Sequence, residues 1–285
     1  MDNSFQKQID KAAVLLEALP YLQKFRGETF LIKVGGSAMD DSALVRRLLR
    51  DVVFMEVAGI NPVIVHGGGK AISAAMQESG LKAQFVGGLR ITTDESMEIV
   101  EKTLSGVINP GLVEGLESFG GKAIGVPGNE AFIEEREVSL GRVGRVVGFD
   151  TSRIRAAIAT EIVPVVSPVA SEVDTKLSLN VNADLAASAL ASELKAAKLI
   201  YLSDVLGLMQ DPSDESTLIH SLNARDAEGL IEDGTIGGGM IPKVRSSVEA
   251  LNAGVGKVHM IDGRISHSLL LEIFTEDGIG TEIVK

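Results

Sequence analysis

The chain has 285 residues, of which 45% are hydrophobic and 31 are glycine, and this composition predicts an ordered α/β protein with one large domain or two lobes. Lys and Arg number 27 against 39 Asp and Glu, so the net charge of −12 disfavours nucleic acid and anionic membranes as partners. The absence of cysteine excludes disulfides, thiolate nucleophiles and cysteine-based metal sites.

The first 27 residues are predicted to form a helix ahead of the first strand. Apolar residues recur there at intervals of three or four, from Phe5 through Ile9 and Leu16 to Leu19. Pro20 is expected to kink or end this helix. Two interpretations stay open: a helix packed on its own domain, or an arm that packs on another subunit. Charged residues interrupt this segment, and no apolar run reaches the roughly 20 residues that span a bilayer, so a cytoplasmic protein is expected.

From Thr29 onward, strands alternate with helices. Strands are expected at 29–34, 61–65, 122–126, 162–166, 198–203 and 257–261. Helices are expected at 40–58, 70–80, 94–118, 151–159, 183–196, 224–233, 242–253 and 266–275, and a hairpin should pair 134–139 with 142–148. Strands rich in Val, Ile and Leu that alternate with helices predict a mainly parallel sheet covered on both faces. Such sheets bind ligands at the carboxyl ends of their strands.

Two predicted strands end in glycines, as Lys33-Val34-Gly35-Gly36-Ser37 and Val65-His66-Gly67-Gly68-Gly69. Chain without Cβ atoms lets backbone N–H groups approach an anion, and the helices that follow favour negative charge at their N-termini. The sequences match neither the P-loop nor the dinucleotide fingerprint. A phosphate site is therefore the hypothesis, with tight turns and an edge lysine as the alternative; His66 is interpreted as a structural residue.

Further candidates are polar residues in loops and at helix starts. Arg90 could clamp a carboxylate bidentately or be a surface residue. Asn182 suits an N-cap and Asp184 the first turn of a helix, which leaves Asn180 free for a ligand. Lys243 opposes the dipole at a helix N-terminus, which is unfavourable unless an anion lies beside it.

Together these motifs resemble the amino acid kinase family. The matching pieces are K-V-G-G-S at 33–37, V-H-G-G-G at 65–69, G-L-R-I-T at 88–92, N-V-N-A-D at 180–184, L-S-D-V-L-G at 202–207 and G-G-M-I-P-K at 238–243, in the family's order. The resemblance implies a three-layer αβα sandwich with a mostly parallel sheet of about eight strands. It also implies an oligomerisation helix at 1–27, an amino-acid-substrate lobe at 28–195 and a nucleotide-binding lobe at 196–285.

The family branch that this chain resembles uses ATP and Mg²⁺ to phosphorylate the γ-carboxylate of N-acetyl-L-glutamate, the second step of arginine biosynthesis. A carboxylate with a pKa of about 4 is already ionised near pH 7, so no general base is needed. This agrees with a chain poor in histidine and free of cysteine. The metal is expected mainly on phosphate oxygens and water, so no protein ligand is assigned to it.

The resemblance also assigns roles to individual residues. Those expected at the transferred phosphoryl group are Lys33, Lys243, Asp184, which aligns both lysines, and Gly68 and Gly69, which donate N–H groups. Those expected to bind the amino-acid substrate are Gly68, Gly69, Arg90 and Asn180. Those expected at the nucleotide are Gly35, Gly36, Ser203, Asp204, Val205, Gly207, Met209, Gly239 and Lys243.

The segments around Tyr21 and at 267–281 are similar to arginine-sensitive members of the family. Those members are hexamers, trimers of dimers interlaced through the N-terminal helix. The resemblance implies feedback inhibition by L-arginine between that helix and the C-terminal lobe. The contacts expected for arginine are Tyr21, His267, Glu272 and Gly278.

Two alternatives stay open. One is a sister kinase that acts on carrier-linked or acylated aminoadipate in lysine biosynthesis, because Lys70 and the stretch 126–130 depart from the usual pattern near the acyl pocket. The other is a non-catalytic arginine sensor on the same fold, which the intact Lys33, Asp184 and Lys243 disfavour. The L-R-I-T stretch at 89–92 and the arginine-type C-terminus favour acetylglutamate.

Overall fold

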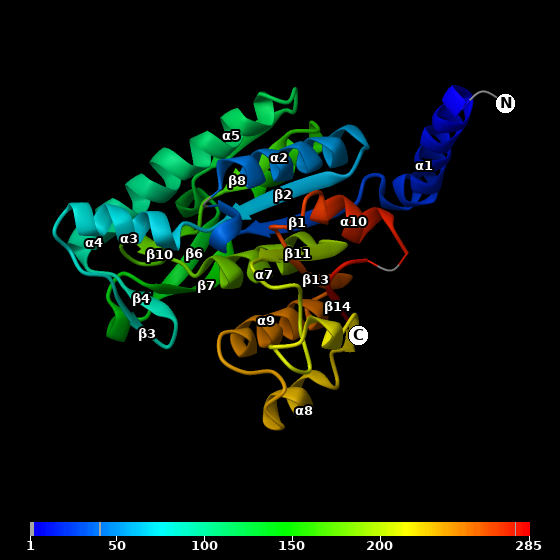
Figure 1. The fold of residues 1–285 in the computed structure, drawn as a ribbon. Helices are drawn as coiled ribbons and strands as arrows, with labels where there is room; N and C mark the ends of the chain where they lie inside the picture. Colours follow the sequence, from blue (N-terminus) through cyan, green and yellow to red (C-terminus); the bar gives the residue numbers. More distant parts are fainter. Residues whose placement is uncertain (1–2, 40, 277) are drawn as a thin grey trace.

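An eight-stranded sheet forms the centre of the molecule (Figure 1). The computed structural model describes residues 3–39, 41–276 and 278–285. The strands run in the order β12-β14-β13-β11-β1-β2-β8-β5, and only the pair β13–β14 is antiparallel. Their bounds are β1 Thr29–Val34, β2 Asn61–His66, β5 Ala123–Val126, β8 Val163–Val166, β11 Lys198–Ser203, β12 Ser221–Asn223, β13 Lys257–Asp262 and β14 Thr281–Val284. The predicted α/β class with a mostly parallel sheet is confirmed.

Helices cover both faces of this sheet (Figure 1). On one face pack α2 (Ser42–Val57), α5 (Asn109–Glu117) and α10 (Ser268–Phe274); on the other pack α6 (Ser152–Ala159), α7 (Ala183–Leu194) and α9 (Met240–Asn252). Successive strand residues point to opposite faces. Phe30 and Ile32 of β1 therefore pack toward α2, whereas Leu31 packs toward α7. The same alternation directs Lys33 toward α7.

A smaller four-stranded sheet, β10-β9-β6-β7, lies beside the main one. Its strands are β6 Phe132–Arg136, β7 Gly144–Phe149, β9 Val169–Glu172 and β10 Ser178–Asn180. The antiparallel pair β6–β7 confirms the predicted hairpin, with shorter strands than expected. Strands β9 and β10 were not predicted, because four and three residues are too few to show an alternating pattern.

A two-stranded hairpin of β3 (Gln84–Val86) and β4 (Leu89–Ile91) stands between α3 (Gly69–Glu78) and α4 (Asp94–Thr103). Its turn residues Gly87 and Gly88 both have positive φ, 58° and 82°, the conformation of a tight hairpin turn that glycine adopts without strain. The predicted helix 94–118 is continuous but changes form. Helix α4 passes into a π-helical turn at Leu104–Ile108 and then into α5.

Helix α1 (Asn3–Phe25) extends away from the body of the molecule (Figure 1). It runs through Pro20, so of the two expected effects of this proline, a kink or an end of the helix, the end does not occur. Aromatic packing holds the last turn, with the Tyr21 ring 6.5 Å from Phe25 and 6.4 Å from Phe274. Residues 1 and 2 of the predicted N-terminal segment lie outside the described residues. Within the described ranges, no helix is long and apolar enough to cross a membrane.

Candidate active site

Two lysines and one aspartate meet at the carboxyl edge of the main sheet. Lys33 Nζ lies 2.8 Å from Asp184 Oδ1, and Lys243 Nζ lies 3.8 Å from Asp184 Oδ2. Lys33 comes from the end of β1, Asp184 from the first turn of α7 and Lys243 from the first turns of α9. Asn182 caps α7 by accepting the N–H of residues 184 and 185, as predicted, and so fixes the start of that helix.

The pKa values of Asp184 and Lys243 are both shifted in this arrangement. Burial would raise the pKa of Asp184, but Lys33 and Lys243 outweigh it and bring the pKa below its usual value. Burial lowers the pKa of Lys243, and Asp184, with Asp204, offsets this only in part. Two cations that share one carboxylate leave a net positive charge in a chain of net charge −12. This local charge suits an anion.

The glycines leave room for this arrangement. A Cβ at Gly35 would lie 2.3 Å from Lys33 Nζ, because the ammonium group folds back over that residue. The two strand ends are joined by a hydrogen bond from the Gly67 N–H to the Val34 carbonyl, 2.7 Å long. Helix α3 begins at Gly69. The first N–H groups of a helix have no partner within the helix and point out of its N-terminus, where anions are favoured.

A cavity of about 210 Å³ lies next to Lys33 and is also lined by Asp184, Arg90 and Asn180. Arg90 Nη2 donates to the Gly69 carbonyl at 2.8 Å and to Ser73 Oγ at 2.9 Å. The glycine residues that line the cavity are Gly35, Gly36, Gly67, Gly68, Gly69 and Gly88. The structure therefore brings the predicted substrate residues and the first predicted lysine to one cavity.

Most residues predicted for the nucleotide follow β11 or lie around the start of α9, whereas Gly35 and Gly36 line the cavity next to Lys33. Ser203 ends β11, Asp204 acts electrostatically on Lys243, and Gly239 precedes the first turn of α9. Farther along, Gly207 packs against Thr281 so closely that a Cβ would lie 2.4 Å from its Oγ1. Met209 forms a bridge with Leu218. Val205 accepts a hydrogen bond from Ser203 Oγ at 3.4 Å.

The residues predicted for arginine divide between two places. Tyr21, Glu272 and Gly278 line a cavity of about 510 Å³ between α1, α10 and the strand edge. His267 lies elsewhere, where its Nδ1 is 2.7 Å from Asp51 Oδ1 on α2.

Two residues of the larger cavity were missed by sequence reasoning. Lys198 Nζ lies 2.8 Å from His259 Nε2, and His259 Nδ1 lies 2.6 Å from Glu272 Oε1. Burial lowers the pKa of Lys198 to about 8. The signal available in the sequence was one lysine and one histidine, each in a predicted strand whose other residues are mostly apolar.

Tyr201 is the residue near the lysines that sequence reasoning missed. It is fully buried in β11, in register with Lys33 on β1. Its hydroxyl donates to the Asp184 carbonyl at 3.3 Å, and its ring centroid lies 5.7 Å from Lys243 Nζ. A single aromatic residue in an aliphatic strand was the only signal in the sequence.

His66 is buried at the end of β2. Asn109 Nδ2 lies 3.2 Å from its Nε2 and its Nδ1 lies 2.9 Å from the Gly67 carbonyl, so Nδ1 carries the proton in the neutral ring. Burial lowers the pKa of His66 to about 4, and the ring is neutral near pH 7. This geometry supports a structural role.

An α/β enzyme that gathers two lysines and glycine amides at the carboxyl edge of a parallel sheet is suited to phosphoryl transfer. A model of the amino acid kinase family matches residues 28–262, and the chain belongs to this family.

Similar proteins agree with this assignment. The chain is 59% identical to the acetylglutamate kinase of Akkermansia muciniphila, over 100% of this chain and 99% of that one. It is 46% identical to the acetylglutamate kinase of Methanocaldococcus jannaschii, over 98% of each chain. A solved structure of N-acetylglutamate synthase from Neisseria gonorrhoeae, complexed with coenzyme A and N-acetyl-glutamate, is similar with a TM-score of 0.85 at 25% identity; the match covers 96% of this chain and 63% of the synthase.

Proposed function

We propose that this enzyme transfers the γ-phosphoryl group of ATP to the γ-carboxylate of N-acetyl-L-glutamate, the second step of arginine biosynthesis. The observation that carries the proposal is the Lys33–Asp184–Lys243 arrangement beside the cavity that Arg90 and Asn180 line. Full-length similarity to acetylglutamate kinases supports the choice of substrate.

In the proposed reaction, a γ-carboxylate oxygen attacks the γ-phosphorus of ATP. The new O–P bond forms as the bond to the β-phosphate oxygen breaks, and ADP leaves with that electron pair. Lys33, Lys243 and the amides of Gly68 and Gly69 neutralise charge on the transferred group, and Asp184 aligns the lysines. The ionised carboxylate needs no base.

The two substrates are proposed to approach from opposite sides of Asp184. Arg90 and Asn180 hold the α-carboxylate of the amino acid within the segment 28–195, since both line the cavity next to Lys33. ATP lies mainly against the segment 196–285, and its phosphates reach Gly35 and Gly36 at the end of β1. The residues of 196–285 proposed to contact it are Ser203, Asp204, Val205, Gly207, Met209, Gly239 and Lys243. The proximity of Asp204 to Lys243 supports this division.

Mg²⁺ is proposed to arrive with ATP. Among the described residues there is no group of three or more histidine or carboxylate side chains that could hold a metal ion. Phosphate oxygens and water are the ligands that Mg²⁺ commonly keeps in such sites. The ion would add charge neutralisation to that of the lysines.

A coupled assay of ADP release tests the reaction, with N-acetyl-L-glutamate in one series and acylated aminoadipate in the other. We expect turnover with N-acetyl-L-glutamate. Turnover confined to the aminoadipate series would identify the sister kinase instead, and no turnover in either would refute the kinase proposal.

Two variants test the residue roles. Lys243→Ala should lower kcat by roughly 10²- to 10³-fold with little change in KM for the amino acid, because its charge is needed in the transition state.

Arg90→Ala should mainly raise KM for the amino acid. An unchanged KM in Arg90→Ala would refute its assigned role.

We also propose that L-arginine inhibits the enzyme at the cavity of about 510 Å³ lined by Tyr21, Glu272 and Gly278. The buried Glu272 carboxylate and Lys198, which both contact His259, offer partners for the α-ammonium and α-carboxylate groups of an amino acid. Arginine titrations of the wild type and of Tyr21→Ala test this proposal. A flat titration of an active wild type would refute it and leave the kinase reaction untouched.

Self-association through α1, into a hexamer built from dimers, is the third part of the proposal. Large apolar side chains on this helix are exposed, among them Phe5 at 65%, Leu15 at 72% and Leu16 at 67%. Burying such a stripe against another copy of the chain would remove apolar surface from water.

A further inference from the structure

A short segment around Arg142 joins the two strands that carry Arg90 and Asn180. The Thr92 N–H donates to the Leu140 carbonyl at 3.0 Å, and the Arg142 N–H donates to the Thr92 carbonyl at 2.6 Å. On its other side, the Arg142 carbonyl accepts the N–H of Asn180 at 2.8 Å. Arg142 therefore lies between the two residues proposed to hold the substrate α-carboxylate.

Packing leaves little freedom in the junction that residues 140–142 form with Thr92 and Asn180. Gly141 has a φ of 79°, and a Cβ there would lie 2.3 Å from the Thr92 carbonyl oxygen. Thr92 Oγ1 accepts a hydrogen bond from Asn180 Nδ2 at 3.1 Å and donates one to the Arg90 carbonyl at 3.1 Å. The position of Asn180 relative to Arg90 is thus set by a continuous chain of contacts.

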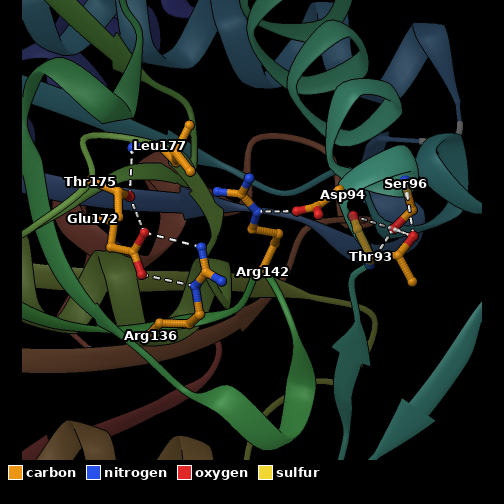
Figure 2. Close-up of polar contacts among 8 residues, drawn as sticks. All are labelled: Thr93, Asp94, Ser96, Arg136, Arg142, Glu172, Thr175 and Leu177. Carbon is orange, nitrogen blue, oxygen red and sulfur yellow. Dashed lines mark hydrogen bonds and ion pairs between the residues drawn. The ribbon is translucent and has the colours of Figure 1, made fainter.

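The Arg142 side chain fastens this junction to α4. Its Nε forms an ion pair with Asp94, in the first turn of that helix; the Arg142 side chain is only 14% exposed, whereas that of Asp94 is 83% exposed. Figure 2 shows the guanidinium between Asp94 on one side and Glu172 on the other. Glu172 is already paired with Arg136 at 2.8 Å; the hydrogen bond from Thr175 does most to lower the pKa of Glu172, and Arg142 adds a smaller contribution.

The beginning of α4 is itself fixed. Thr93 and Ser96 form a capping box, in which each side chain accepts the other residue's backbone N–H (Figure 2). Asp94 follows Arg90 of β4 by only four residues, so the ion pair at Asp94 limits how far β4 can move.

Stability alone does not account for the arginine. Among the described residues, its Nη1 is buried without a hydrogen-bond partner, and burying an unpaired donor lowers stability. A guanidinium that is kept largely out of water yet not fully paired has to be explained by what it holds in place.

We propose that Arg142 is a positioning residue for the amino-acid substrate: its backbone and its ion pair with Asp94 keep Arg90 and Asn180 at the separation that one α-carboxylate requires. The inference rests on the proposed function, since it concerns binding of N-acetyl-L-glutamate. Arg142 acts through these two residues and not by touching the reacting groups.

Steady-state kinetics of Arg142→Met and Asp94→Asn, with each substrate varied in turn, test the proposal. Displacing binding groups by a fraction of an ångström weakens binding of the ligand that they share, so we expect KM for N-acetyl-L-glutamate to rise roughly tenfold in each variant. The value of kcat should stay within about twofold and KM for ATP should not change, because Lys33, Asp184 and Lys243 are held by other elements. The double variant should resemble either single variant, because both lose one interaction.

Matched controls separate positioning from general damage. Arg145→Met removes an arginine of the same hairpin that pairs with Glu135 at 2.9 Å, with the two side chains 75% and 63% exposed. Glu95→Gln removes an acidic residue from the same first turn of α4. Both controls should keep the wild-type KM.

The possible outcomes are distinct. Wild-type turnover with an unchanged KM in Arg142→Met and Asp94→Asn would overturn this inference alone. Absence of wild-type turnover would overturn the proposed function, and this inference with it. If Arg142→Met fails to fold, Asp94→Asn decides the matter, because it changes an exposed side chain and a thermal melt can verify its fold.

Discussion

At the scale of single residues, the chemistry of the site depends on how Asp184 shares its charge between Lys33 and Lys243. The pKa of Lys243 is lowered by burial and partly restored by Asp184. A lysine that neutralises phosphate charge has to be protonated. The alkaline pH at which activity is lost therefore reports on the ionisation of Lys243 beside Asp184.

Asp184→Asn should move the alkaline limb of the kcat/KM profile to lower pH. Removing the carboxylate removes an interaction that raises the pKa of Lys243, so the lysine loses its proton earlier as pH rises. Initial rates measured from neutral to alkaline pH provide the test. An alkaline limb at the wild-type position would show that Asp184 does not control this ionisation.

Glu134 presents a different case, a carboxyl group without a partner. It is completely buried on β6, and among the described residues neither oxygen has a hydrogen-bond partner. Burial raises its pKa from 4.5 to about 8. Between these values the folded protein keeps the proton that the unfolded chain has lost, so stability falls as pH rises through this window.

Glu134→Gln should therefore stabilise the protein, by roughly 1–3 kcal/mol near pH 8 and by little near pH 4.5. Urea denaturation at both pH values measures the difference. Glu135→Gln, its exposed neighbour, serves as the control and should have no such pH-dependent effect. Equal stability of Glu134→Gln and wild type at pH 8 would contradict the assigned ionisation.

At the scale of elements, the turn after β5 shows how closely the two sheets approach. A Cβ at Gly128 would lie 2.0 Å from the Ser167 carbonyl oxygen and 2.2 Å from that of Val169. Both are backbone atoms of neighbouring segments, which cannot move aside as a flexible side chain would. The small sheet thus depends on glycine at this crossing.

Gly128→Ala should lower the free energy of unfolding by roughly 3 kcal/mol, because the added methyl group overpacks this crossing. The matched change Gly111→Ala lies in α5, where a Cβ would meet nothing within 4 Å. It should stabilise the helix by up to about 1 kcal/mol. Denaturation curves of both variants give the comparison, and equal effects would refute the steric argument.

At the scale of the whole molecule, α1 extends away from the body of the molecule, and most of its described residues are exposed (Figure 1). Its C-terminal turn packs on α10 through Tyr21 and Phe274, whereas its earlier apolar side chains are exposed. The core formed by the central sheet and its helices does not depend on that exposed part.

The double variant Leu15→Glu/Leu16→Glu should reduce the mass of the assembly and leave the fold intact. Charges on this stripe oppose its burial against another copy of the chain. Sedimentation velocity measures the mass, and circular dichroism checks the fold. Val138→Glu, at a side chain 82% exposed in the β6–β7 connection, is the control. An unchanged mass of the double variant would mean that the subunits associate without α1.

Much of this architecture was predictable from local patterns. Strands β1 and β11 have the predicted bounds, 29–34 and 198–203, because most of their residues are apolar, as expected for strands that are covered on both faces of the sheet. Asn182 identified the start of α7 because capping depends on neighbouring residues. Lys33 and Lys243 stood out because each is a cation where local chemistry disfavours one, within an apolar strand and at a helix N-terminus.

Other features followed from contacts between segments distant in the sequence. Strands β9 and β10 exist because they pair with β6 and with each other. Tyr201 reaches Asp184 because α7 packs on the face of β11 to which this ring points, and the Arg142–Asp94 pair joins residues 48 positions apart. Local sequence patterns give no information about contacts between residues that lie so far apart in the chain. The sequence therefore identified the charged groups of the site, whereas the packing of α7 and α9 on one face of the sheet brought them to a single carboxylate.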